Sequence, residues 1–227
     1  MFDVIIPLRS GSKRLKNKNI KNFTGDNLAN FTIKKLIKIK EIRKIFILTD
    51  SNFYKKKILK NKKINLEYPR PKQLSKDNSS INDLVTDFLK WANNKYDLKK
   101  ILFFHVTCPL ISTKEIKKTI GFIKRKKINS LIHVSEVMEH PYECIDKIGP
   151  NWNFVKENLV ANRQNYKKYF FITGSMYYFT TQFLFKNKRM YNKTSFAYEV
   201  DKINFIDINT KLDFEMAKAL LKFKIRN

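Results

Sequence analysis

The segment VIIPLRSGSKRLKNKNIK, residues 4–21, changes character at Pro7, where an apolar run ends and a basic loop begins. The run is short, β-branched and without polar alternation, which is typical of a buried strand. Ser10, Gly11 and Ser12 are then surrounded by six cations: Arg9, Lys13, Arg14, Lys16, Lys18 and Lys21. Such a loop can turn backbone N–H groups and positive charge toward an anion. A solvated basic loop would explain the same residues.

The loop matches neither of the common glycine-rich phosphate motifs. Gly11 lacks the second glycine and the Lys-Ser/Thr pair of a P-loop, and the spacing is not that of a dinucleotide fingerprint. The junction of strand and loop nevertheless supplies Arg9, Lys13 and Lys18, whose charge-assisted hydrogen bonds could hold a triphosphate.

Strands and helices alternate along the rest of the chain. The apolar pattern predicts strands at 44–50, 100–110 and 129–137, and helices within 30–42, 79–96 and 113–127. Continuous apolar strands separated by helices favour an α/β fold with a mostly parallel sheet and helices on both faces. Ligands of such sheets bind at the carboxyl ends of the strands.

Two later stretches depart from the regular alternation. Residues 138–170 carry only short strand-like pieces and turns, which indicates an insertion, and a strand at 170–181 is broken by Gly174. Residues 203–223 predict a strand, a turn and an amphipathic helix. The 227 residues contain no linker, so we expect a single domain.

The composition limits the class of protein. Hydrophobic residues make up 43% and aromatic residues 14%, too much for a disordered chain. Cys108 and Cys144 imply no disulfide framework and are expected in the core. The apolar runs are shorter than the roughly 20 residues of a membrane span, and Asp3 stands where a signal peptide is basic. We therefore expect a cytoplasmic protein.

The net charge of +27 suits nucleic acid, an anionic membrane or phosphorylated substrates. Only eight of the 47 basic residues are Arg, the side chain that best reads base edges, and the lysines are spread along the whole chain. The charge therefore favours neither a nucleic-acid partner nor a membrane partner over an anionic small molecule.

Several residues are candidates for chemistry. Asp207 ends a predicted strand and could bind Mg²⁺ together with substrate phosphates, Asp50 is a second candidate, and Asp213 fits an N-cap or first-turn role. Arg70 lies between two prolines, which suits either a fixed guanidinium or a rigid surface loop. The pairs His105 with Cys108 and His140 with Cys144 only weakly suggest zinc.

Eight segments occur in an order that resembles the acylneuraminate cytidylyltransferases, also called CMP-sialic acid synthetases. They are IIPLRSGSKRLKNKNIK, ILTDS, RPKQLSKDNSS, HVTCPL, HPYECI, NRQNY, ITGSMYYF and IDINTKLDF. The resemblance covers nearly the whole chain, and CMP-3-deoxy-octulosonate synthetase is a more distant match. It implies a Rossmann-like nucleotidyltransferase fold in which residues 138–170 form a dimerisation insertion.

The resemblance also implies a reaction. The anomeric hydroxyl of a nine-carbon keto sugar acid would attack the α-phosphate of CTP, giving a CMP-sugar and pyrophosphate, with Mg²⁺ and in a homodimer. The implied catalytic residues are Arg9, Lys13, Lys18 and Asp207, and the implied metal ligands are Asp207 and Asn209. The implied nucleotide contacts are Arg9, Ser10, Gly11, Ser12, Lys13, Asn19, Arg70 and Ser79. The implied sugar contacts are His105, Thr107, Arg163, Thr173, Gly174 and Tyr177.

Departures from the family pattern bear on substrate and activity. Asn209 replaces a second metal-binding Asp, His105 replaces a sugar-facing Gln, and Ile111 replaces an Arg. Thr173 replaces an Asn, Phe171 an Arg of some members, and Glu143 a Lys. These changes predict a nonulosonic acid other than ordinary sialic acid, such as a legionaminic or pseudaminic type. The alternatives are a CMP-3-deoxy-octulosonate synthetase-like enzyme, a catalytically degenerate CTP-binding protein and a basic nucleic-acid-binding protein.

Overall fold

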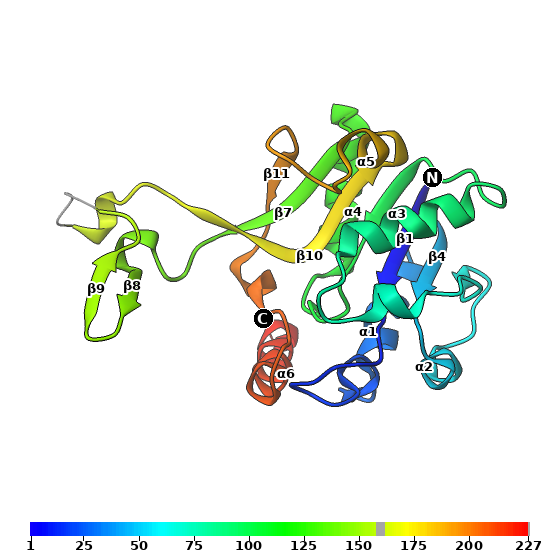
Figure 1. Ribbon diagram of the computed structural model, residues 1–227, viewed down its shortest axis with the longest axis horizontal. Helices are drawn as coiled ribbons and strands as arrows, with labels where there is room; N and C mark the ends of the chain where they lie inside the picture. The colour runs from blue at the N-terminus through cyan, green and yellow to red at the C-terminus, as the bar shows by residue number, and fades with distance from the viewer. Residues whose placement is uncertain (158–161, 227) are drawn as a thin grey trace.

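The structure, a computed structural model, describes residues 1–157 and 162–226, and its centre is a seven-stranded sheet (Figure 1). The strand order is β11-β7-β10-β6-β1-β4-β5. The strands are β1 (Phe2–Pro7), β4 (Ile42–Leu48), β5 (Ile64–Asn65), β6 (Lys100–Phe103), β7 (Ser130–Glu136), β10 (Phe170–Thr180) and β11 (Phe196–Glu199). Strand β10 is antiparallel to β6 and β7, whereas the remaining pairs are parallel. The predicted mostly parallel α/β sheet is confirmed.

Helices with well-formed N-caps connect these strands. The helices are α1 (Leu28–Ile37), α2 (Asn52–Lys57), α3 (Ile81–Ala92), α4 (Thr113–Lys126), α5 (Thr181–Asn187) and α6 (Lys211–Arg226). Ser112 Oγ caps α4 by accepting a hydrogen bond from the amide of Glu115, and Ser80 Oγ caps α3. Asp213 accepts from the amides of Asn209 and Thr210, which confirms its structural role at the start of α6.

Apolar residues pack on both faces of the sheet. Val4 and Ile6 of β1 face the side covered by α1, α2 and α4, and Ile5 faces the side covered by α3 and α5. This alternation follows from the period of two along a strand. Helix α6 packs separately, through Phe214 and Ala217, against a small hairpin of β2 (Asn22–Phe23) and β3 (Asp26–Asn27). These three clusters leave the carboxyl end of β1 free for a ligand.

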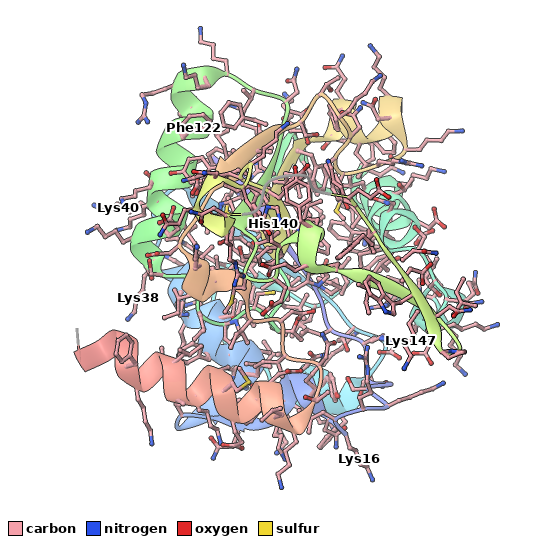
Figure 2. The ribbon with its side chains drawn as sticks, turned by 90° about the vertical axis from the view of Figure 1, so that its left-hand side faces the viewer. Lys16, Lys38, Lys40, Phe122, His140 and Lys147 are labelled. Carbon is pink, nitrogen blue, oxygen red and sulfur yellow. The ribbon has the colours of Figure 1, made fainter. Side chains whose placement is uncertain are left out.

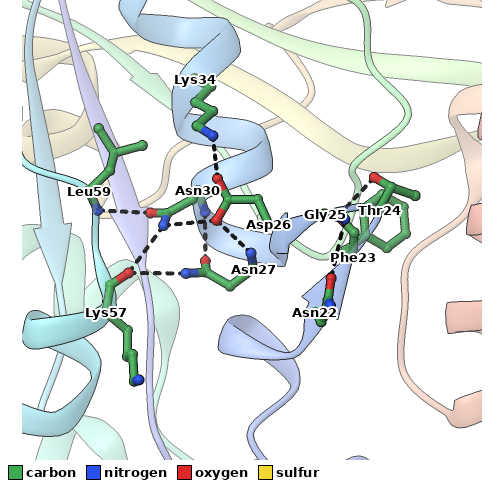
Figure 3. A network of polar contacts seen from close by, with 10 residues as sticks. All are labelled: Asn22, Phe23, Thr24, Gly25, Asp26, Asn27, Asn30, Lys34, Lys57 and Leu59. Carbon is green, nitrogen blue, oxygen red and sulfur yellow. Dashed lines mark hydrogen bonds and ion pairs between the residues drawn. The ribbon is translucent and has the colours of Figure 1, made fainter.

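A polar network ties the start of α1 to the loop that follows α2 (Figure 3). The Asn30 side chain is buried; its Nδ2 donates to Asp26 Oδ1 and to the Lys57 carbonyl, and its Oδ1 accepts from the Leu59 amide. Asn27 caps the helix by accepting from the Asn30 amide. Asparagine supplies both donors and an acceptor here, so one side chain satisfies two backbone groups of residues 57–59 and also the Asp26 carboxylate.

Three predictions of local structure were wrong. The strand predicted at 100–110 ends at Phe103, and the strand predicted from residue 203 is instead a 3-10 helix, η5 (Lys202–Phe205). Strand β10 is not interrupted at Gly174; its pairing with β7 shifts register there instead. Cys108 is buried as predicted, but Cys144 is only half-buried. Short apolar runs do not by themselves tell a strand from a buried loop.

Residues within the predicted insertion form an arm that projects from the body at the end of β7 and β10 (Figure 1). It carries a hairpin of β8 (Ile145–Ile148) and β9 (Asn151–Phe154), and residues 158–161 lie outside the described part of the chain. Every hairpin residue is exposed. No described helix is long and apolar enough to cross a membrane.

Candidate active site

A cleft of about 590 Å³ opens at the carboxyl ends of β1 and β6. From β1 the chain runs to β4 on one side and returns to β6 on the other, so the cleft lies where the strand order reverses. Eleven of the predicted site residues line it: Arg9, Ser12, Lys13, Lys18, Asn19, Arg70, Ser79, His105, Thr107, Asp207 and Asn209. Segments from both ends of the chain therefore form one site.

The basic loop after β1 is held in place by hydrogen bonds. Asp50 accepts from the amide and the hydroxyl of Ser10, both at 3.0 Å, and Asn19 Nδ2 donates to the carbonyl of Arg9 at 3.1 Å. Asp50, the second candidate metal ligand, thus fixes the loop. Ser10 and Gly11 do not line the cleft, although they form the turn that presents Arg9 and Ser12 to it.

Two of the predicted catalytic cations are paired with an acid across the cleft. Arg9 Nη1 lies 2.5 Å and Lys13 Nζ 2.6 Å from the two carboxylate oxygens of Asp77, in the segment between η2 (Lys72–Ser75) and α3. Hydrogen bonds from Lys13 and Arg9 lower the pKa of Asp77. A bound triphosphate would compete with this carboxylate for the same cations.

Arg70 is positioned as its flanking prolines suggested. Its Nη1 donates to the Leu48 carbonyl and its Nη2 to the Leu74 carbonyl, and its buried Nε has no partner. Burial lowers the pKa of Arg70, whose charge the nearby Asp50 favours. The guanidinium is half-buried and its Nε–H has no hydrogen-bond partner, which favours binding of an anionic ligand over a role in a surface loop. Ser79 Oγ lies beside it in the cleft wall and donates to the Gln73 carbonyl.

Asp207 lies on a loop that other cleft residues hold. The Ile208 amide donates to the Thr107 carbonyl at 2.8 Å, and Lys18 Nζ donates to the Ile208 carbonyl at 2.5 Å. Asn209 Nδ2 donates to Asp207 Oδ2, while Asn209 Oδ1 faces Lys18 Nζ at 3.4 Å. Burial lowers the pKa of Lys18, although Asp207 partly opposes this shift.

The donor set at Asp207 suits a hard cation. Its exposed carboxylate and the amide oxygen of Asn209 are both oxygen ligands, and Mg²⁺ takes one or two such ligands and completes its shell with phosphates and water. Within residues 1–157 and 162–226, no cluster of three or more His, Cys, Asp or Glu side chains could hold a metal. The weak suggestion of zinc therefore has no structural support.

The predicted sugar contacts divide into three groups. His105 and Thr107 line the cleft; Tyr177 packs edge-on against His105 with ring centroids 6.2 Å apart, and Thr173 and Gly174 lie behind it. Burial lowers the pKa of His105. Arg163 is outside the cleft, on the arm, and pairs with Glu143 at 3.2 Å. Ile111, in place of an arginine, is a core residue.

Asp77 and Lys76 also line the cleft, although no sequence pattern singled them out, and so does Arg14, which was predicted only as a cation of the basic loop. Asp77 belongs to the quoted motif RPKQLSKDNSS, where an acid between basic residues could have suggested a partner for Arg9. The pairing itself joins residues 68 positions apart. No local pattern reveals such a contact.

The family model for cytidylyltransferases matches residues 4–223. The chain belongs to the cytidylyltransferase family. This cytidylyltransferase is 26% identical to an N-acylneuraminate cytidylyltransferase of Streptococcus agalactiae serotype V over 92% of its own length and 51% of the relative's. It is 26% identical to the CMP-N,N'-diacetyllegionaminic acid synthase of Legionella pneumophila, over 96% and 95% of the two chains. A Campylobacter jejuni pseudaminic acid cytidylyltransferase is 24% identical over 96% and 95%. The chain spans about half the length of the streptococcal relative.

Solved structures share the fold. A CMP:2-keto-3-deoxy-manno-octonic acid synthetase complexed with CTP has a TM-score of 0.70 and 11% identity, covering 98% of this chain and 99% of its own. A 4-diphosphocytidyl-2C-methyl-D-erythritol synthase from Anaerococcus prevotii has a TM-score of 0.66 and 16% identity, covering 97% and 96%. The predicted nucleotidyltransferase fold is confirmed.

Proposed function

We propose that this cytidylyltransferase transfers CMP from CTP to the anomeric hydroxyl of a nine-carbon keto sugar acid. The hydroxyl oxygen bonds to the α-phosphorus, the bond from that phosphorus to the β-phosphate bridge breaks, and pyrophosphate and a proton leave. The observation that carries the proposal is the convergence of Arg9, Lys13, Lys18 and Arg70 with Asp207 in one cleft at the reversal of strand order. The names of relatives that each match at least 92% of the chain support the acceptor class.

The cations would act on the charge that moves during transfer. Arg9 and Lys13 would exchange Asp77 for phosphate oxygens, so that negative charge on the departing pyrophosphate meets donors already in place. Asp77 would keep both side chains at the cleft until CTP arrives. Arg70, fixed by two carbonyls, would bind an anionic or carbonyl oxygen with the part of its guanidinium that lines the cleft.

We also propose that the reaction requires Mg²⁺. Asp207 and Asn209 would hold the ion, with the Asn209 amide turned so that its oxygen, which here faces Lys18, takes the place of Nδ2 beside Asp207. When bound, the ion would orient the triphosphate. Lys18 holds the loop that carries both ligands through the Ile208 carbonyl. Its role in this state is therefore to position Asp207, and direct contact with phosphate would require Lys18 to release that carbonyl.

The acceptor would be a legionaminic or pseudaminic type of acid. His105, neutral at physiological pH because burial lowers its pKa, replaces an amide at the predicted sugar side, and Ile111 places no charge in the cleft.

We further propose that the arm joins two copies into a homodimer and that the protein works in the cytoplasm, where CTP is made. An isolated two-stranded hairpin is marginal in water, which supports a partner for β8 and β9.

The test is pyrophosphate release from CTP and Mg²⁺ with a panel of legionaminic, pseudaminic, N-acetylneuraminic and 3-deoxy-octulosonic acids, with Asp207→Ala as the control. Turnover of a nine-carbon acid that the substitution abolishes is the expected result. CTP binding without turnover of any acid would support the degenerate alternative. Binding of generic nucleic acid without a preference for CTP would support the nucleic-acid alternative.

A further inference from the structure

Strand β10 bulges at one place, and a single buried histidine stands opposite the bulge. Ile172 pairs with Val134 and Tyr177 pairs with Ile132, so residues 173–176 face only His133 on β7. Extra residues in a bulge lose their ladder partners and need others. His133 is 0% exposed and supplies one, because its Nδ1 lies 3.1 Å from Ser175 Oγ.

The hydrogen bonds around His133 favour one arrangement of protons. Thr119 Oγ1 donates its only proton to the Glu115 carbonyl at 3.0 Å, so its 3.0 Å contact with His133 Nε2 requires the ring to donate. Burial lowers the pKa of His133 to about 3, so the ring is neutral and Nδ1 is an acceptor. Nδ1 then accepts a hydrogen bond from Ser175 Oγ.

The chain of hydroxyls continues to the wall of the cleft. If Ser175 donates to His133, its oxygen accepts from Thr173 Oγ1 at 2.8 Å, a shorter contact for the Thr173 proton than the His133 carbonyl at 3.5 Å. The Thr173 carbonyl lies 3.6 Å from Cys108 Sγ, which is 3.9 Å from Asp207 Oδ1. The next residue, Gly174, has φ +71°, and a Cβ there would touch Cys108 Sγ and the Tyr177 hydroxyl. The bulge therefore lies directly behind residues that line the cleft.

We infer that His133, as the neutral Nε2–H tautomer, is the positioning residue that sets the shape of the bulge and thereby the sugar-acid side of the cleft. The inference rests on the proposed function. Among the described residues, no hydrogen bond or ring contact joins His133 to a residue that lines the cleft, so its substitution should act on the acid through Thr173 to Tyr177. The nucleotide side depends on the loop after β1 and on Arg70, which share no contact with His133.

Steady-state kinetics with the acid that the panel identifies test this. His133→Leu and the smaller change Ser175→Ala should raise the KM for the acid about tenfold, the loss expected when a buried polar group is left unpaired. The KM for CTP should change less than about twofold. His133→Gln keeps one donor and one acceptor and should restore much of the affinity. Ser135→Ala is the control, because Ser135 is buried on the same strand and its hydroxyl has no partner.

A second measurement does not depend on turnover. The imidazole nitrogen chemical shifts of His133 should be those of a neutral Nε2–H ring at neutral pH. An Nδ1–H ring would overturn the inference, as would an unchanged KM for the acid in both His133→Leu and Ser175→Ala. A wild-type chain that turned over no acid of the panel would instead contradict the proposed function, and the ring nitrogens would still decide the proton arrangement.

Discussion

At the scale of the residue, Asn209 is the departure that bears most directly on chemistry. Its neutral amide sits 3.1 Å from Asp207 Oδ2, where a second carboxylate would add negative charge for a divalent ion. We predict that Asn209→Asp lowers the Mg²⁺ concentration for half-maximal activity about tenfold, since one added charged ligand contributes on the order of 1.4 kcal/mol. A Mg²⁺ titration of pyrophosphate release measures it.

The control for this prediction is Asn93→Asp, which makes the same exchange at an exposed position after α3. It should leave the Mg²⁺ requirement unchanged. An equal shift in both variants would mean that general charge, and not a ligand, causes the effect.

His133 also predicts a pH dependence of stability. Its pKa is about 3 in the folded chain and about 6.5 when unfolded, so between these values the unfolded chain binds more protons. Stability must therefore fall as pH falls through this window, by up to about 1.4 kcal/mol per pH unit from this residue. Urea unfolding at a series of pH values should show a shallower loss for His133→Gln than for the wild type. If stability falls equally with pH in the wild type and in His133→Gln, the His133 ring is not held neutral in the folded chain.

At the scale of the element, the start of α1 depends on Asn30 (Figure 3). Asn30→Ala removes the partner of the Leu59 amide and one of the two donors to the Lys57 carbonyl, which keeps its hydrogen bond from Asn27 Nδ2. We predict a loss of about 1–3 kcal/mol in the free energy of unfolding, because the Leu59 amide is left unsatisfied. Urea denaturation measures this loss. Lys34→Ala is the control: it breaks only a partly exposed ion pair with Asp26 and should cost less than about 1 kcal/mol.

The arm is the element that we propose to pair with a second copy of the chain. Trp152 and Ile148 are 53% and 69% exposed on a hairpin that has no core of its own. We predict that Trp152→Lys shifts the protein from dimer toward monomer, because a charge replaces an aromatic anchor of the contact. Sedimentation velocity over a range of protein concentrations measures this.

Phe53→Lys on α2 is the matched control, since Phe53 is 52% exposed on the body of the molecule. It should leave the dimer intact. A wild-type protein that stays monomeric at all concentrations would contradict the dimer itself, whereas dissociation in both variants would contradict a specific role of the arm.

At the scale of the whole molecule, the charge of +27 is distributed and not concentrated. Lys38 and Lys40 project from one side of the view in Figure 2, and Lys16 and Lys147 from the other. A distributed positive field attracts anions of any kind, and the cleft then selects among them. Net charge alone therefore does not distinguish a nucleic-acid partner from a small anionic substrate.

This field predicts a salt dependence of encounter. Raising ionic strength from about 0.01 M to about 0.1 M shortens the Debye length from about 30 Å to about 10 Å. We predict that kcat/KM for CTP falls about threefold to tenfold over this range, with kcat less affected, because anionic substrates lose attraction at a distance. The double change Lys38→Gln and Lys40→Gln should leave the slope nearly unchanged. A kcat/KM independent of salt would contradict steering.

The sequence by itself determined the alternating fold, the caps of α3 and α4, the basic loop after β1 and most of the residues that line the cleft. These features depend on local periodicity, on caps within one turn and on motifs a few residues long. Tertiary structure alone decided that Asp77 pairs with Arg9 and Lys13, that Arg163 lies on the arm, and that His133 stands opposite the bulge. The physical reason is that each of these contacts joins segments far apart in the chain, whose meeting depends on how the sheet is assembled.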